Sequence, residues 1–241
     1  MNDQNSNQPL TKTQRRELRK QEIAQQRQGQ QRRSNLWIWA IVLAGVLVIG
    51  GLVYWVATGS DNPGTPVTGA ADAPVLGGTD AKVVVSEFSD LSCPACAAAV
   101  PVIRQLADIY GDQIKIEFRS FPIGHQWSEK SLEAGRCALA QGQFWEYAEV
   151  VFAKQADWET ASNAVDLFKS YAKDVGLDPS QFDSCLDSGQ TASAIQEDVK
   201  LGRDRGVSAT PTFFINDQKI VGVQSIDQFK NTIDGELSKI N

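Results

Sequence analysis

A run of 22 residues without a charge, "LWIWAIVLAGVLVIGGLVYWVA" at positions 36–57, constrains this chain more than any other feature. As a helix rising 1.5 Å per residue it would be roughly 33 Å long, which is enough to cross the hydrocarbon core of a bilayer. Trp37, Trp39, Tyr54 and Trp55 stand near its ends, where aromatic rings prefer the headgroup region. A cleaved secretory signal is the alternative, but its apolar stretch is usually only about 7–15 residues long. The run predicts a single transmembrane helix.

The charges on either side of this run predict its orientation. Residues 1–35 carry eight basic and three acidic side chains, so that 15 of the chain's 23 basic and 26 of its 29 acidic residues follow the run. Positive charge favours the cytoplasmic side, and the basic tail of residues 1–35 is therefore expected in the cytoplasm and the remainder outside the cell membrane. The outer part has a net charge of −11, which argues against nucleic acid as a partner.

Composition divides the outer part into a linker and one folded domain. Residues 58–80 are rich in Gly, Pro, Thr and Asp, as is typical of a flexible linker, and the domain is expected over residues 81–241. The expected elements are strands at 82–88 and 114–120, a helix from the first cysteine pair to about 110, a helical insertion at about 126–205, a hairpin around 216–218 and a helix at about 225–240. This order predicts an α/β domain whose mixed sheet has helices on both faces.

The stretch "SDLSCPACAAAV" places Cys93 and Cys96 two residues apart at the start of a helix. The pair could bind zinc, form a structural disulfide or act as a redox pair. Zinc would need four ligands, and the other two cysteines and the single histidine stand far away with no second CxxC. A disulfide that closes a loop of about four residues stabilises little. Redox chemistry fits best, because Pro94 suits the first helical turn and the helix N-terminus favours a thiolate at Cys93.

Three stretches of the outer part carry a family resemblance: "PVLGGTDAKVVVSEFSDLSCPACAAAV", "CALAQGQFWEYAEVVFAKQADW" and "GVSATPTFFIND". They are similar to the entry strand and active-site helix, the helical insert and the cis-proline loop of the DsbA-like thiol-disulfide oxidoreductases of bacterial envelopes. CxxC alone is a weak signal, but CxxC after a strand with Thr-Pro some 115 residues later beside a hairpin is strong. The resemblance covers residues 74–241 and implies a thioredoxin-like α/β fold with an inserted helical domain, here preceded by the transmembrane helix.

The resemblance also implies roles for single residues. Cys93 matches the exposed nucleophile of the family and Cys96 its buried partner. Glu87 matches the buried acid that moves protons to and from the inner cysteine, and burial does raise the pKa of a carboxyl group. An edge position that faces solvent is the alternative for this residue. Thr210 and Pro211 match the cis-proline loop, whose backbone would pair with an extended substrate, and an ordinary trans turn is the alternative there.

Between the two cysteines the chain has Pro94 and Ala95, whereas the strongest oxidants of the family carry a histidine at the second place. Ala95 cannot stabilise a thiolate electrostatically. The resemblance therefore implies a less extreme oxidant.

Three further residues have more than one interpretation. Cys137 and Cys185 are 48 positions apart, and the resemblance implies a structural disulfide between them, as in some relatives. A second redox pair that relays electrons is the alternative. His125 is interpreted as a packing or capping residue, or as a group at the rim of the active site that tunes the nucleophile.

Taken together, these features predict a membrane-tethered dithiol oxidase that introduces disulfides into exported proteins through Cys93 and Cys96. The resemblance implies no metal or organic cofactor, reduced exported proteins as substrates, and a quinone-linked membrane reoxidase of the DsbB or vitamin-K-epoxide-reductase (VKOR) type. One alternative is a disulfide reductase or isomerase on the same fold, although residues 58–80 are too short and polar for the dimerisation domain that such isomerases usually have. The other is a non-catalytic module that binds client chains near Pro211.

Overall fold

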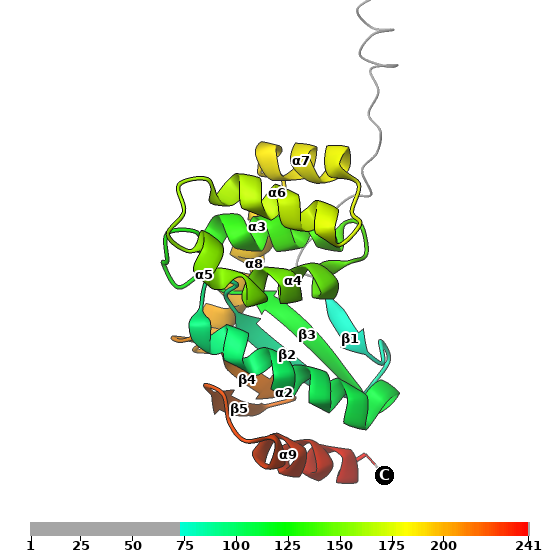
Figure 1. Cartoon of the computed structure of the whole chain (residues 1–241). Helices are drawn as coiled ribbons and strands as arrows, with labels where there is room; N and C mark the ends of the chain where they lie inside the picture. Colours follow the sequence, from blue (N-terminus) through cyan, green and yellow to red (C-terminus); the bar gives the residue numbers. More distant parts are fainter. Residues whose placement is uncertain (1–72, 241) are drawn as a thin grey trace, which may run out of the picture. The chain divides into compact units, whose positions relative to one another are not determined.

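The computed structural model describes residues 73–240, which form a five-stranded sheet with helices on both faces (Figure 1). The strands lie in the order β1-β3-β2-β4-β5, with β2 and β3 parallel and all other neighbours antiparallel. Their bounds are β1 Val75–Gly77, β2 Val83–Ser89, β3 Ile114–Ser120, β4 Thr212–Ile215 and β5 Gln218–Val221. The predicted mixed sheet is confirmed. The predicted tail and membrane span, residues 1–57, lie outside the described residues.

The sheet begins earlier in the chain than the sequence boundary near Ala81 predicts. Strand β1 falls inside the segment predicted as a linker, residues 58–80, and pairs with the outer edge of β3, Val75 opposite Glu117 and Gly77 opposite Lys115. A strand of three residues is too short to show a periodic pattern, which explains the error. The end of the predicted linker is therefore part of the folded domain.

Helices α2 (Pro94–Tyr110) and α9 (Ile226–Ser238) cover one face of the sheet. The side of α2 that faces the strands carries Ala99, Ile103 and Leu106, whose spacing of three and four residues places them on one stripe of a helix. A short 3-10 turn, η1 (Gly111–Gln113), leads from α2 into β3. Helix α2 thereby connects the two parallel central strands, and its first residues lie where β2 ends.

The segment between β3 and β4 forms the helical insertion. Its helices are α3 (Ser128–Leu139), α4 (Phe144–Ala153), α5 (Gln155–Trp158), α6 (Ala164–Asp174), α7 (Pro179–Ser188) and α8 (Ala192–Asp204). Phe118 of β3 packs on Phe144 of α4 with ring centroids 4.8 Å apart. A Cβ atom at Gly202 of α8 would lie 2.7 Å from the ring of Phe121, so only glycine lets α8 approach this closely. The insertion thus shares its apolar core with the sheet.

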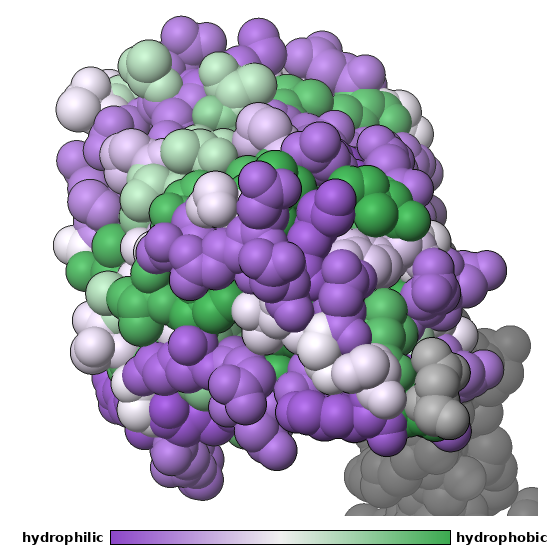
Figure 2. Space-filling view, turned by 90° about the horizontal axis from the view of Figure 1, so that it is seen from below, coloured by the Kyte–Doolittle hydropathy of each residue, from purple (hydrophilic) through white to green (hydrophobic). Residues whose placement is uncertain are grey.

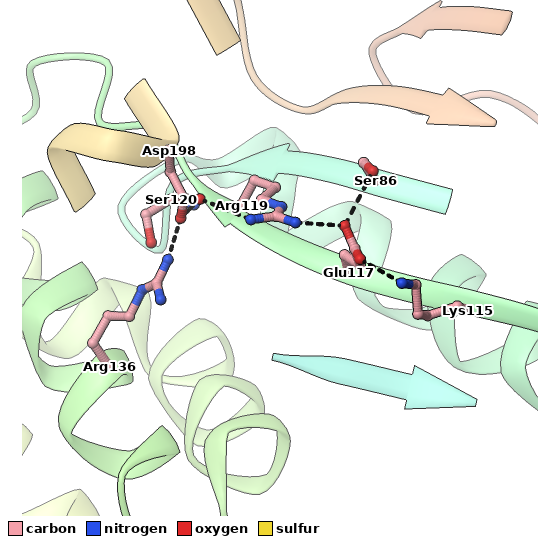
Figure 3. A network of polar contacts seen from close by, with 7 residues as sticks. All are labelled: Ser86, Lys115, Glu117, Arg119, Ser120, Arg136 and Asp198. Atoms are coloured by element: carbon pink, nitrogen blue, oxygen red, sulfur yellow. Dashed lines mark hydrogen bonds and ion pairs between the residues drawn. The ribbon is translucent and has the colours of Figure 1, made fainter. Parts of the chain in front are cut away.

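A charge network fastens α3 and α8 to the face of the sheet opposite α2 (Figure 3). It consists of Ser86, Lys115, Glu117, Arg119, Ser120, Arg136 and Asp198. The fully buried carboxylate of Asp198 on α8 accepts hydrogen bonds from the backbone N–H of Ser120 at 2.9 Å and from Arg119 at 3.3 Å. It also forms an ion pair with Arg136 of α3. One buried carboxylate therefore links β3, α3 and α8.

The predicted hairpin is confirmed, with Asn216 and Asp217 as its turn and Gln218 as the first residue of β5. Asn216 has a positive φ of 49°, which asparagine tolerates better than most residues. Its side-chain oxygen accepts a hydrogen bond from the backbone N–H of Val84 at 2.9 Å. The turn therefore also fastens β4 to the start of β2.

None of the helices within residues 73–240 combines the length and the apolarity that crossing a bilayer requires. On the face around α9, hydrophilic side chains cover most of the surface and separate the hydrophobic patches from one another (Figure 2). The exposed large apolar side chains of the described part are Ile109, Ile123, Val221, Val223 and Ile240.

Candidate active site

Cys93 lies where β2 gives way to α2. It is the N-cap residue of α2, with extended backbone angles (φ −86°, ψ 120°), and Pro94 is the first helical residue. Its carbonyl oxygen accepts hydrogen bonds from the N–H groups of Cys96 at 3.0 Å and Ala97 at 3.1 Å. Because the first N–H groups of a helix point out of its N-terminus, this position favours a negative charge on the sulfur.

Asp90 holds the segment that precedes Cys93. Its carboxylate is fully buried and accepts hydrogen bonds from the N–H groups of Ser92 and Ile123, both at 2.9 Å. The hydroxyl of Ser128 donates a third, at 2.6 Å. Sequence reasoning missed this residue, because an aspartate after a strand is an ordinary loop residue until its burial is known. Asp90 ties the cysteine loop to the loop between β3 and α3.

Gln155 of α5 holds the same segment from the helical insertion. Its side-chain amide donates hydrogen bonds to the carbonyl oxygens of Leu91 at 2.7 Å and Cys93 at 3.2 Å. Nothing in the sequence signals this contact, since it joins residues more than sixty positions apart. The insertion therefore takes part in positioning Cys93.

The Cys93 residue is only 4% exposed, so the prediction of an exposed nucleophile is wrong for this conformation. Its sulfur lies 3.6 Å from the carbonyl oxygen of Thr210, to which the protonated form of Cys93 donates a hydrogen bond. The cover comes from the loop before β4, where the Thr210-Pro211 peptide bond is cis. The nucleophile and the predicted substrate-binding loop are therefore in direct contact.

The pKa of Cys93 is lowered from 9.0 to about 5, chiefly by a hydrogen bond from the side chain of Cys96. Burial opposes this change, and the Thr210 side chain and the backbone N–H groups of Ala95 and Cys96 add to it. At neutral pH the Cys93 sulfur is therefore a thiolate.

Cys96, one helical turn further on, behaves in the opposite way. It is fully buried, and burial, the Cys93 sulfur and the charge of Glu87 together raise its pKa well above the ordinary value. Neither of the two cysteines forms a disulfide in this structure. The two cysteines thus differ sharply, one being ionised and the other protonated at neutral pH.

Glu87 lies behind this pair, in the middle of β2 between β3 and β4, opposite Phe118 and Phe213. It is 4% exposed, so the alternative of an edge position facing solvent is wrong. Burial is the main cause that raises its pKa from 4.5 to about 7, and the Cys93 charge raises it further. The Ser89 hydroxyl, two residues along β2, lowers the pKa of both Glu87 and Cys96. Near neutral pH this carboxyl group can both give and take a proton.

The other predicted residues lie around or away from this centre. Pro94 and Ala95, between the cysteines, are exposed. Cys137 of α3 and Cys185 of α7 form a disulfide with their Cα atoms 5.8 Å apart, inside the helical insertion. His125 is exposed and lines a polar hollow between the start of α3 and α8, whose lining does not include Cys93.

Comparisons with known proteins agree with this geometry. A family model described as thioredoxin matches residues 69–235. The chain is 32% identical over 174 residues to disulfide bond formation protein D of Bacillus subtilis, covering 68% of this chain and 77% of that protein. The crystal structure of oxidised BdbD from Bacillus subtilis matches with a TM-score of 0.61 and 28% identity, covering 69% of this chain and 93% of that one.

A second group of relatives matches over only part of its length. The chain is 33% identical over 155 residues to a Na⁺/H⁺ antiporter, NhaA 3, of Salinispora tropica. The match covers 64% of this chain and 23% of the antiporter. The chain therefore spans about a quarter of the length of these relatives.

Proposed function

The chain belongs to the DsbA-like thiol-disulfide oxidoreductases of the thioredoxin fold, and on this premise we propose that it oxidises cysteine pairs of exported proteins through Cys93 and Cys96. The observation that carries the proposal is the contrast between the two sulfurs. The pKa of Cys93 is lowered to about 5, whereas that of Cys96 is raised. A thiolate stabilised in the reduced enzyme favours that state, and so favours transfer of the disulfide to a substrate.

The reaction begins with a substrate thiolate that attacks the Cys93 sulfur of the oxidised enzyme. A bond forms between substrate and Cys93, the bond to Cys96 breaks, and its electron pair stays on Cys96. A second substrate thiolate then attacks the substrate sulfur of this mixed disulfide, and Cys93 leaves as a thiolate. The substrate has lost two electrons and gained a disulfide, and the enzyme is left reduced.

Glu87 has the position and the pKa for the proton transfers that accompany these steps. Cys96 leaves as a thiolate in a buried site, where its raised pKa makes it take up a proton at once. Glu87, with a pKa of about 7, supplies this proton and takes one back when the pair is reoxidised. Reoxidation, by resemblance, would be the work of a quinone-linked membrane protein of the DsbB or VKOR type.

Thr210 and Pro211 are proposed as the part of the site that holds the substrate. The Thr210 carbonyl oxygen, 3.6 Å from the Cys93 sulfur, is close enough to align an extended peptide beside the reacting atom. The backbone N–H of the same residue would be the donor to such a peptide. Replacing Thr210 by Pro removes this donor and should weaken substrate capture. An unchanged KM for a reduced model protein would contradict this role.

Replacement of single cysteines tests the proposed function. Cys93→Ser should abolish oxidation of a reduced model protein, whereas Cys96→Ser should accumulate a mixed disulfide at Cys93. A variant with both Cys137 and Cys185 changed to Ser controls for the second pair and should retain turnover. Turnover retained in Cys93→Ser would contradict the assignment of the nucleophile.

A reductase is the second candidate, and the lack of a charge at the second position between the cysteines favours it. Every hydrogen bond that lowers the pKa of Cys93 comes from an uncharged group, and Ala95 contributes only its backbone N–H. The reduction potential of the Cys93–Cys96 pair separates the two functions. On the family scale a reduction potential of about −120 mV marks an oxidase, and one of about −270 mV marks a reductase.

The location is proposed from the sequence. Residues 36–57 would anchor the chain in the cell membrane, with residues 1–35 in the cytoplasm and the catalytic domain outside. A protease added to intact spheroplasts should then digest the domain. Full protection of the domain in intact spheroplasts, with digestion after lysis, would contradict this orientation.

A further inference from the structure

A small cavity lies next to Glu87, between α2, α4 and the sheet. Its volume is about 20 Å³, which is enough for one water molecule. The residues that matter in its lining are Glu87, Val100, Arg104, Phe118, Ala148 and Glu149. The lining is mainly apolar, and the ionisable side chains in it, Glu87, Arg104 and Glu149, would be the partners of a water molecule there.

The inner cysteine and two residues of the cavity lining follow one another along one side of α2. Cys96, Val100 and Arg104 are four residues apart and lie on one stripe of the helix. Cys96 is fully buried, Val100 lines the cavity, and the Arg104 side chain is 34% exposed. The cavity therefore lies between a buried reacting group and solvent.

Arg104 and Glu149 of α4 close the outer end of the cavity. They form an ion pair in which the Nε–H of Arg104 donates to the Glu149 carboxylate, and the Glu149 side chain is 41% exposed. The guanidinium carbon of Arg104 lies 5.9 Å from the ring centroid of Trp145, which also lines the cavity. The pair is in contact with water on one side and with the cavity on the other.

We propose that the Arg104–Glu149 pair is the gate through which the buried proton of Glu87 exchanges with solvent, by way of one water molecule in the cavity. This inference rests on the proposed dithiol–disulfide exchange. Arg104 and Glu149 are positioning residues in it, since they act on the reacting sulfurs only through Glu87. When Cys96 takes the Glu87 proton, the carboxylate left behind regains one from solvent through the water molecule.

Charges facing Glu87 come from a small set of residues. Cys93, at the N-cap of α2, and Cys96 interact with Glu87 electrostatically, and Arg104 of α2 and Glu149 of α4 line the same cavity as Glu87. The facing residues of β3 and β4 are phenylalanines. An intact Arg104–Glu149 pair is neutral overall. Loss of one partner leaves the charge of the other at the cavity, so the two single variants should change the proton affinity of Glu87 in opposite directions.

Titration of Glu87 in the reduced full-length chain, followed by ¹³C NMR of labelled carboxyl groups, tests the gate. Arg104→Gln leaves the negative charge of Glu149 and should raise the pKa of Glu87, whereas Glu149→Gln leaves the positive charge and should lower it, each by about half a unit or more. The double variant should return near the original value. Shifts in one direction only, or no shift, would mean that the charges of the pair do not act on Glu87, and either result would overturn the inference.

The exposed pair Lys200–Asp204 on α8 is a matched control, because it is also an ion pair on a helix but does not line the cavity. Lys200→Gln and Asp204→Asn should leave the Glu87 titration unchanged. A shift in these variants as large as in the Arg104 and Glu149 variants would mean that any change of surface charge acts on Glu87, and would overturn the assignment of a gate.

The cavity itself is tested by filling it. Val100→Leu adds one methylene group where the free volume lies, and it should slow the pH-dependent attack of Cys96 on a mixed disulfide at least about threefold. Val102→Leu adds the same group on α2 outside the cavity lining and should leave this rate unchanged. Equal rates in the two variants would overturn the role of the water molecule.

Failure of the inference and failure of the proposed function give different results. If the unmodified chain exchanges no disulfides, the proposed function fails, and the NMR titration still reports whether the pair acts on Glu87. If the unmodified chain is active and the charge variants leave the Glu87 titration unchanged, only the gate is overturned.

Discussion

Two glutamates on neighbouring strands show how the same sheet raises the pKa of one carboxyl group and lowers that of the other. Glu87 on β2 is 4% exposed and Glu117 on β3 is 9% exposed. In the register of the two strands Glu87 lies opposite Phe118, and Glu117 lies opposite Ser86. Because successive residues of a strand point to opposite faces, the two carboxyl groups lie on different sides of the sheet.

The difference between them is the presence of cations. Burial raises the pKa of Glu117, but hydrogen bonds from Arg119 at 2.8 Å and Lys115 at 3.0 Å outweigh it, and the pKa ends below its ordinary value. Glu87 has no such cation within hydrogen-bonding distance in the described residues, and burial raises its pKa to about 7. Burial alone therefore does not bring a carboxyl group to a pKa near neutrality, whereas burial without a cation does so here.

The largest expected effect is on the face of the sheet that carries Glu117 and the charge network of Figure 3. Asp198→Asn removes a fully buried negative charge that Arg119 and Arg136 share, and it should lower the free energy of unfolding by about 3 kcal/mol or more. Urea unfolding at pH 7 measures this loss, with the exposed Asp204→Asn as control. The reduction potential of the Cys93–Cys96 pair should stay unchanged. A loss no larger than that of the control would mean that the network does not fasten the insertion.

The second prediction concerns Glu87, on the other face of the sheet, where a substitution should increase the free energy of unfolding. The pKa of Glu87 is raised, so the folded reduced protein holds a proton that the unfolded chain releases between pH 4.5 and about 7, and stability falls as the pH rises through this window. Glu87→Gln removes the group that titrates, and with it this loss of stability at high pH. The variant should therefore gain up to about 3 kcal/mol in the free energy of unfolding at pH 8 and nothing at pH 4.

Glu117→Gln is the matched control for this experiment and should behave in the opposite way. The folded-state pKa of Glu117 is lowered, so its contribution to stability is present above the ordinary pKa and is lost as the pH falls through the lowered value. The Gln variant should be less stable than the original chain at pH 8, with the difference disappearing in acid. Changes of the same sign in both variants would contradict the contrast between the two faces.

Sequence patterns predicted the elements that carry the site, but not the contrast between the two glutamates. The β-branched run before the cysteine pair and the alternation of Ile114, Ile116 and Phe118 gave the two central strands, because a side-chain period of two is visible in one sequence. Glu87 and Glu117 both look like charged residues within apolar strands. The cations beside Glu117, Lys115 and Arg119, are two residues away on the same strand, so the period of two places them on its face. The burial of Glu87 between Phe118 and Phe213 depends on the register with β3 and β4, which local sequence does not show.

The cavity between α2 and α4 was beyond sequence reasoning for a related reason. Arg104 and Glu149 are each typical of a solvated helix face, and 45 residues separate them. Their pairing follows from how the helical insertion packs on α2, which is a tertiary property. Gln155 and Asp90 were missed for the same reason, since their function in the site consists of hydrogen bonds to distant backbone groups.

The smallest expected effect comes from Lys115, a partly exposed member of the charge network around Glu117. The Lys115 side chain is 24% exposed, and Glu117 keeps Arg119 as a partner when Lys115 is changed to Gln. The variant should raise the pKa of Glu117 toward its ordinary value and lower the free energy of unfolding at pH 7 by only about 0.5 kcal/mol, because a partly solvated pair is screened by water. Unfolding at low and at 1 M salt measures this, and the difference should shrink at high salt. A loss as large as that of Asp198→Asn, unaffected by salt, would mean that Lys115 belongs to the buried part of the network and that Arg119 alone does not suffice to keep Glu117 ionised.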